Sequence, residues 1–117
     1  MTLTITSENR PWGKFFNYIQ NKPCTVKILS VKENSILSLQ SHEKRDENWV
    51  VLEGSCECLI GNEWNSAIEG DIIVIPRLIK HRIKTSNSSV KIMEISTGEF
   101  DENDIVRYED EYGRCEK

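Results

Sequence analysis

Four side chains that can bind a metal ion stand out in the sequence: Gln40, His42, Glu47 and His81. They include both histidines of the protein. Because side chains alternate between the two faces of a β-strand, Gln40 and His42 should point to the same side, as two ligands of one ion must. Imidazole, carboxylate and amide oxygen together form a mixed nitrogen and oxygen site. The spacing therefore predicts one divalent metal ion, with zinc as the first expectation and manganese, iron, nickel or cobalt as alternatives.

The residues around this set form short segments rich in valine, isoleucine and leucine. Gly54, Gly61 and Gly70 lie in turn-forming stretches between some of them, and no segment shows a long, capped helical period. This pattern predicts an all-β fold, either a closed barrel or a double-sheet jelly roll. The expected strands are 26–31, 36–40, 49–52, 56–60, 71–75, 81–84 and 90–96.

The length of 117 residues fits one domain that can bury a core without disulfides. Within it we expect an ordered N-terminal strap over residues 1–24, a barrel core over 25–98 and a charged C-terminal extension over 99–117. The composition of the extension would equally allow a solvated tail.

The charge balance argues against a nucleic-acid or membrane-surface binder, because the net charge is -4 at pH 7. No signal peptide or membrane span is expected, so we predict a soluble, cytoplasmic protein. The even number of cysteines is weak support for disulfides without a secretion signal. Cys56 and Cys58 should be same-face neighbours on a strand, poorly placed to bridge each other. The four cysteines are Cys24, Cys56, Cys58 and Cys115.

The residues on either side of the candidate ligands resemble the two-motif signature of the cupin superfamily. This resemblance implies a small double-stranded β-helix barrel with one interior metal ion. Five residues separate Asn34 from Gln40, Gly54 closes the first motif, and the second runs from Gly70 through Pro76 to His81. Three positions depart from the usual motif: Gln40 replaces a histidine, and Asn34 and Leu78 replace glycines. Asparagine tolerates a positive φ, but leucine does so poorly, which leaves the turn before His81 open.

A closer resemblance, to the type II mannose-6-phosphate isomerase family, covers almost the whole chain. It rests on residues 10–13, 37–42, 45–49, 75–76, 81–82 and 104–114. That cupin also occurs as the C-terminal domain of bifunctional isomerase/mannose-1-phosphate guanylyltransferases, and in it a glutamine is usual at the metal motif. The family often has histidines where this chain has Glu43, Lys44 and Asn48. These changes leave the metal and the substrate preference open.

The resemblance implies interconversion of mannose 6-phosphate and fructose 6-phosphate, in support of mannose, GDP-mannose and polysaccharide metabolism, by a homodimer. No glycine-rich nucleotide-binding segment precedes the cupin motifs, so guanylyltransferase chemistry is not expected. The reaction needs a base near C1 and C2, for which Glu94 is the candidate. Arginine suits the phosphate. Arg45 and Arg114 are further candidates for catalysis, and the candidates for substrate binding are Arg107, Arg10, Lys14 and Tyr112.

Simpler interpretations stand beside these. Trp12, Trp49 and Trp64 are more typical of packing than of sugar stacking, and Arg107 and Arg114 could pair with acids of their own segment. If both chain ends cover the barrel mouth, the tail is a lid. Two alternatives to the isomerase stay open: a non-catalytic cupin that binds a sugar or a metal, and a related cupin isomerase or epimerase acting on another sugar phosphate or a nucleotide sugar.

Overall fold

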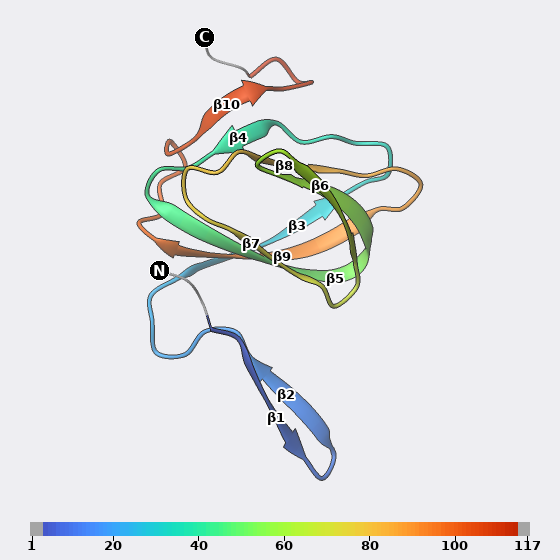
Figure 1. Ribbon diagram of the computed structural model, residues 1–117, viewed down its shortest axis with the longest axis vertical. Coiled ribbons are helices and arrows are strands. Elements are labelled where there is room, and N and C mark those ends of the chain that lie inside the picture. The colour runs from blue at the N-terminus through green and yellow to red at the C-terminus, as the bar shows by residue number, and fades with distance from the viewer. Residues whose placement is uncertain (1–3, 115–117) are drawn as a thin grey trace.

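The computed structural model describes residues 4–114, which form ten strands and no helix (Figure 1). The predicted all-β fold is confirmed. The strands are β1 (Thr6–Arg10), β2 (Gly13–Asn17), β3 (Thr25–Val31), β4 (Leu39–Ser41), β5 (Arg45–Ile60), β6 (Glu63–Ile68), β7 (Ile72–Ile75), β8 (His81–Lys84), β9 (Val90–Gly98) and β10 (Val106–Glu109).

Eight antiparallel strands form the barrel as two sheets that share β5. One sheet has the order β3-β9-β5-β7, and the other joins β10, β4 and β8 to the second half of β5, which also pairs with β6. The inward side chains of both sheets make one apolar core, because alternate residues of each strand face it. Its most deeply buried members are Trp49, Val51, Cys58, Ala67, Ile75, Ile83 and Ile92.

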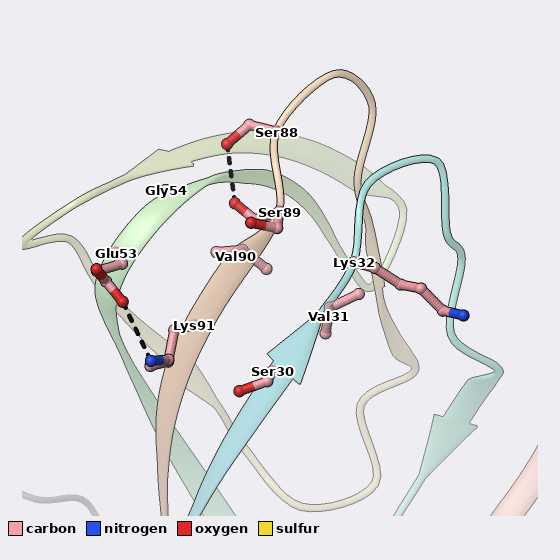
Figure 2. A pocket seen from close by; sticks show the side chains of 9 residues that line it. All are labelled: Ser30, Val31, Lys32, Glu53, Gly54, Ser88, Ser89, Val90 and Lys91. Atoms are coloured by element: carbon pink, nitrogen blue, oxygen red, sulfur yellow. Dashed lines mark hydrogen bonds and ion pairs between the residues drawn. The ribbon is translucent and has the colours of Figure 1, made fainter.

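The predicted strand break at Glu53-Gly54-Ser55 is wrong, because β5 runs unbroken through 16 residues. Gly54 has φ +78°, and the pairing register with β9 shifts between Val51 and Glu53. A Cβ atom at Gly54 would collide with the main-chain oxygen of Ser89, which lies on the neighbouring chain segment (Figure 2). The glycine therefore bends a continuous strand from one sheet into the other, and does not end it.

The N-terminal segment is ordered but does not cover the barrel mouth. Strands β1 and β2 pair only with each other among the described strands, as a hairpin that extends away from the barrel (Figure 1). Trp12, at the tip of the hairpin, is 72% exposed. In the single chain the N-terminal segment therefore does not meet the condition that both chain ends cover the mouth.

The C-terminal extension joins the barrel, since β10 pairs with β4 and places Arg107 opposite Gln40. A fully solvated tail is thus excluded for the part of the extension up to residue 109.

Cys24, Cys56 and Cys58 are free thiols, as expected, with the Sγ atoms of Cys56 and Cys58 3.7 Å apart. Cys115 lies outside the described residues. Over residues 4–114 we find no helix that is long and apolar enough to cross a membrane.

Candidate metal site

His42, Glu47 and His81 come together inside the barrel. The Nε2 atom of His42 lies 3.5 Å from Oε2 of Glu47, and Nε2 of His81 lies 3.6 Å from Oε1 of the same carboxylate. All three side chains are buried, at 1–3% exposure. Ligands of one zinc ion lie roughly 3–3.5 Å apart when each is about 2.0–2.2 Å from the ion. The three residues therefore form a group that could hold a metal ion.

Gln40 lies beside this group. It is the direct cross-strand partner of His81, so the two side chains share a face of the sheet, and both line the same pocket. Its Oε1 atom accepts a hydrogen bond from the Ser38 hydroxyl at 3.0 Å. A carbonyl oxygen has two lone pairs, so this bond orients the amide and leaves one lone pair for an ion.

Both imidazole rings are held with the Nε2 atom toward the centre of the site. The Nδ1 atom of His42 donates to the main-chain oxygen of Asp104 at 2.7 Å, and that of His81 donates to the main-chain oxygen of Ile79 at 3.0 Å. Nε2 of each ring then carries the lone pair. Nε2 of His81 is buried without a hydrogen-bond partner, and burial lowers the pKa of His81, which favours the neutral form that metals bind.

Arg45 and Trp49 flank the same carboxylate, because alternate residues of β5 face inward. The Nε atom of Arg45 donates to Glu47 Oε2 at 3.1 Å, and the indole N–H of Trp49 donates to Oε1 at 3.3 Å. An Nη2 atom of Arg45 also lies 3.3 Å from Nε2 of His42. Arg45 thus touches two of the candidate ligands, and metal binding would replace its hydrogen bond to His42.

Glu94 lies directly behind the ligands, 7% exposed, on the inner face of β9. Burial, reinforced by the hydrogen bond and charge of Glu47, raises the pKa of Glu94 to about 8. Burial also works to raise the pKa of Glu47, but the hydrogen bond with Glu94, the charges of both histidines and the hydrogen bond from Arg45 lower it on balance. In the metal-free state Glu94 therefore holds the proton that the two carboxyl groups share.

The ligand group lies in a pocket of about 160 Å³. Its lining includes three residues that the sequence did not single out: Lys27, Arg82 and Glu102. The Lys27 ammonium donates to the Glu102 carboxylate at 3.0 Å, and Arg82 donates from Nε to the Leu37 main-chain oxygen at 3.0 Å. With Arg45 and Arg107, four cationic residues line this pocket.

An adjoining pocket of about 430 Å³ contains Arg114 and shares Glu102, Ile105 and Arg107 with the first. Arg114 donates from Nε and Nη2 to the two carboxylate oxygens of Asp110, at 2.8 and 3.2 Å. Its guanidinium also lies 5.8 Å from the centre of the exposed Tyr112 ring. Arg107 thus reaches both pockets, whereas Arg114 and Tyr112 do not line the pocket of the ligands.

The predicted substrate contacts Arg10 and Lys14 are not brought to either pocket. Both belong to the projecting hairpin, where the Arg10 guanidinium lies over the Phe15 ring at 4.8 Å and the Lys14 ammonium over the Phe16 ring at 5.1 Å. A role for them at the ligands of the same chain is not supported.

A larger hollow lies elsewhere on the barrel. It measures about 640 Å³. Residues at the end of β3, at the start of β9 and at the bend of β5 line it (Figure 2). Three charged residues line it: Glu53 and Lys91, which pair with each other at 3.2 Å, and Lys32. It contains no histidine or cysteine, so it offers no comparable ligand set.

The turn before His81 adopts the glycine-like conformation although it contains leucine. Leu78 has φ +73° and Asn34 has φ +55°. The N–H of Leu78 donates to the main-chain oxygen of His42 at 2.7 Å, so this turn is tied to the other histidine of the site. A leucine in this region of φ costs about 1–2 kcal/mol, which places strain directly beside the ligands.

Sequence reasoning missed Asp104 as a positioning residue. Its carboxylate accepts the N–H groups of Glu43 and Lys44 at 2.9 and 3.0 Å, while its main-chain oxygen holds His42. Every residue type has a main-chain oxygen, so the sequence cannot indicate the contact with His42. Only the contacts of the Asp104 carboxylate depend on the residue type and could have been predicted from it.

Comparison with known proteins agrees with this geometry. The family model described as mannose-6-phosphate isomerase C-terminal matches residues 3–110. The xanthan biosynthesis protein XanB of Xanthomonas campestris is 36% identical over 107 residues, which are 90% of this chain and 23% of the relative. The mannose-1-phosphate guanylyltransferase ManC of Salmonella typhimurium is 35% identical over 90% of this chain and 22% of the relative. The chain spans less than a quarter of the length of these relatives.

Solved structures agree on the fold. A cupin protein from Bacteroides fragilis superposes with a TM-score of 0.60 at 22% identity, over 64% of this chain and 65% of that one. A cupin 2 conserved barrel domain protein from Rhodopseudomonas palustris gives 0.63 at 15% identity, over 85% and 74% of the two chains. The barrel is therefore a cupin barrel, and the chain belongs to the mannose-6-phosphate isomerase C-terminal family.

Proposed function

We propose that this protein is a metal-dependent aldose-ketose isomerase that interconverts mannose 6-phosphate and fructose 6-phosphate. The observation that carries the proposal is the placement of Glu94 beside His42, Glu47 and His81 in one pocket with cationic side chains at its rim. Membership of the family supports the choice of a phosphorylated sugar.

The residues divide into groups with different tasks. Gln40, His42, Glu47 and His81 would hold a divalent ion, and such an ion supplies Lewis-acid stabilisation of the negative charge that develops on a substrate oxygen. Glu94, as the carboxylate, takes the proton from C2 of the aldose and returns it to C1, while the proton of the C2 hydroxyl passes to the oxygen on C1, so that the carboxylate is regenerated in each turnover.

The phosphate group fits the outer part of the site. A pocket of about 160 Å³ is small for a whole sugar phosphate, since ligand pockets are typically about 300–1,000 Å³. The adjoining pocket of about 430 Å³ shares Arg107 with it and adds Arg114. We therefore assign the C1 and C2 end of the sugar to the inner pocket and the phosphate to Arg107 and Arg114, which replaces the expectation that the N-terminal segment helps to bind it.

The test is formation of fructose 6-phosphate by the purified protein loaded in turn with zinc, manganese, iron, nickel and cobalt. We expect turnover with at least one of these metals, its loss after chelation, and its loss in His81→Ala. Lys84→Ala is the matched control, because Lys84 lies on the same strand but is exposed. Absence of product with every metal, in protein shown to contain the metal, would refute the isomerase.

A second candidate function is a cupin that binds a metal or a small ligand without turnover. Two observations favour this alternative. The inner pocket is small, and Arg45 already occupies part of it through its contacts with Glu47 and His42. This alternative predicts that metal raises the thermal stability of the protein while no fructose 6-phosphate forms.

A further inference from the structure

Lys27 lies beside the candidate base Glu94. Strand β3 pairs with β9 in a register that places Lys27 directly opposite Glu94, and β9 pairs with β5 so that Trp49 is opposite Glu94 on its other side. Glu94 is therefore the middle residue of a row that crosses three strands. Directly opposite residues have Cβ atoms about 4.5–5.5 Å apart. Lys27 thus flanks Glu94 on the side away from β5, the strand that carries the candidate ligand Glu47.

The Lys27 side chain belongs to the inner face of β3. Its neighbours Val26 and Ile28 point outward and are 52% and 59% exposed, whereas Leu29 packs against the core. Lys27 also lines the pocket that contains the candidate metal ligands. The positive charge of Lys27 works to lower the pKa of Glu94, against the larger effect of burial. The ammonium group therefore lies within electrostatic reach of the base.

A surface ion pair holds this ammonium group at the rim of the pocket. Its Nζ atom donates to Oε1 of Glu102 at 3.0 Å and lies 4.6 Å from the centre of the Phe100 ring. The side chain of Glu102 is 75% exposed and that of Lys27 is 36% exposed. Exposed ion pairs contribute only about 0–1 kcal/mol. Exchange of Glu102 for an oxygen of a bound sugar would therefore cost little.

The proposed isomerisation contains a second proton transfer, between the two sugar oxygens. Its carrier must both give up and regain a proton. The three arginines of the pocket do not, because a guanidinium stays protonated, and the two histidines would have their Nε2 atoms on the metal. Glu94 is already engaged with the proton on carbon. Of the described residues that line this pocket, Lys27 is the only amine.

We propose that Lys27 is a catalytic residue that carries the hydroxyl proton between the two oxygens, an inference that rests on the isomerase function proposed above. After Glu94 removes the C2 proton, the Lys27 ammonium gives a proton to the oxyanion on C1. The resulting amine takes the proton of the C2 hydroxyl. Glu94 then returns its proton to C1 as the carbonyl group forms at C2, and both side chains regain their starting state.

The ratio of C2 proton exchange to product formation tests the proposal. Both processes require removal of the C2 proton, but only product formation requires the hydroxyl proton to move. With metal-loaded protein and mannose 6-phosphate in deuterated water, Lys27→Met should form fructose 6-phosphate more slowly and still place deuterium at C2 of mannose 6-phosphate. The ratio of exchange to product should rise at least about tenfold.

Lys91→Met is the matched control for loss of a lysine. Lys91 also pairs with a glutamate, Glu53, at 3.2 Å, but it lies outside the pocket of the candidate ligands. We expect both rates to stay at the wild-type values in this variant. Equal changes in Lys27→Met and Lys91→Met would overturn the proposal, because they would show that the effect does not depend on the position of Lys27.

Two further variants separate a proton carrier from a charge and from an ion pair. Lys27→Arg keeps the positive charge but does not give up its proton, so the ratio should rise as it does in Lys27→Met. Glu102→Gln removes the ion pair and keeps the ammonium group, so the ratio should stay at the wild-type value. A wild-type ratio in Lys27→Arg, or a raised ratio in Glu102→Gln, would overturn the proposal.

Chemical rescue keeps the test independent of any effect on folding. Ethylamine added to Lys27→Ala should restore part of the product formation, because the partly exposed site admits a small amine in place of the side chain. Absence of rescue in a variant that retains its metal would overturn the role of Lys27. An active wild type with an unchanged ratio in Lys27→Met would refute this role alone. A metal-loaded wild type that forms no product would refute the isomerase itself.

Discussion

The Nδ1 atom of His42 donates a hydrogen bond to the main-chain oxygen of Asp104, 2.7 Å away and 62 residues later in the sequence. A segment outside the predicted barrel core therefore orients a ligand of the site. The carboxylate of Asp104 fixes that oxygen, because it accepts the N–H groups of Glu43 and Lys44.

Replacing Asp104 by alanine should weaken metal binding. Loss of its two hydrogen bonds frees the loop around His42, and removal of groups that orient metal ligands typically costs 10–100-fold in affinity; we expect a loss of about tenfold in a metal titration. The free energy of unfolding should fall by about 1 kcal/mol. Glu99→Ala is the control, since it removes the exposed side chain that forms a surface ion pair with Lys44 at 3.7 Å and keeps the main-chain hydrogen bond from Glu99 to Lys44. Unchanged metal affinity in Asp104→Ala would contradict this role.

Leu78→Gly should stabilise the protein. Leu78 is 64% exposed at φ +73°, so the substitution removes backbone strain and loses little packing. The greater freedom of glycine in the unfolded chain offsets part of the gain, and we expect about 0.5–1 kcal/mol in denaturant unfolding. Ile79, the next residue, has an ordinary φ, so Ile79→Gly should instead destabilise the protein. A loss of stability in both variants would show that the turn is not strained.

Asn48→Leu should also raise the free energy of unfolding. Asn48 is 1% exposed, and neither its Oδ1 nor its Nδ2 atom has a hydrogen-bond partner. A buried amide without partners costs about 1–3 kcal/mol, which a side chain of similar shape and no polarity avoids. We expect a gain of about 1–2 kcal/mol by thermal unfolding, and no gain from Asn65→Leu on the exposed edge of β6. A destabilised Asn48→Leu would mean that the amide is satisfied.

The Asp110 and Arg114 pair should be visible in an acid titration. The hydrogen bonds of the Arg114 guanidinium, with those of the Arg114 and Tyr112 main chain, lower the pKa of Asp110 to about 2. Because the folded pKa lies below the ordinary value of 3.8, the contribution of this pair to stability is complete above 3.8 and is lost as the pH falls toward 2. Carboxyl NMR shifts should report a pKa near 2, which returns toward 3.8 in Arg114→Ala. An ordinary pKa for Asp110 in the wild type would show that Arg114 does not pair with it.

Strand alternation accounts for the part of the site that follows from the sequence. Residues two apart on one strand share a face, and this rule alone places Gln40 with His42 and Arg45 with Glu47. Pairing across strands follows no such rule, so the register that sets Gln40 against His81 and Trp49 against Glu94 is visible only in the folded barrel. A main-chain oxygen such as that of Asp104 leaves no trace in residue type.

The incorrect expectations have physical causes as well. A glycine such as Gly54 is typical of a strand end, but with positive φ it can equally place a bulge within a strand. A substrate role for Arg10 and Lys14 requires their segment to cover the mouth, whereas hairpin pairing carries them away from it. Local sequence sets the hairpin but not its direction relative to the barrel.

Exchange of the substrate C2 proton in deuterated water tests the central claim most directly. The metal-loaded wild type should exchange the C2 proton of mannose 6-phosphate with solvent deuterium while fructose 6-phosphate forms. Glu94→Gln, which removes the base but keeps a side chain of similar shape, should retain the metal and lose at least about a hundredfold of this rate. Exchange at the wild-type rate in Glu94→Gln, or none in a wild type shown to contain its metal, would contradict the account.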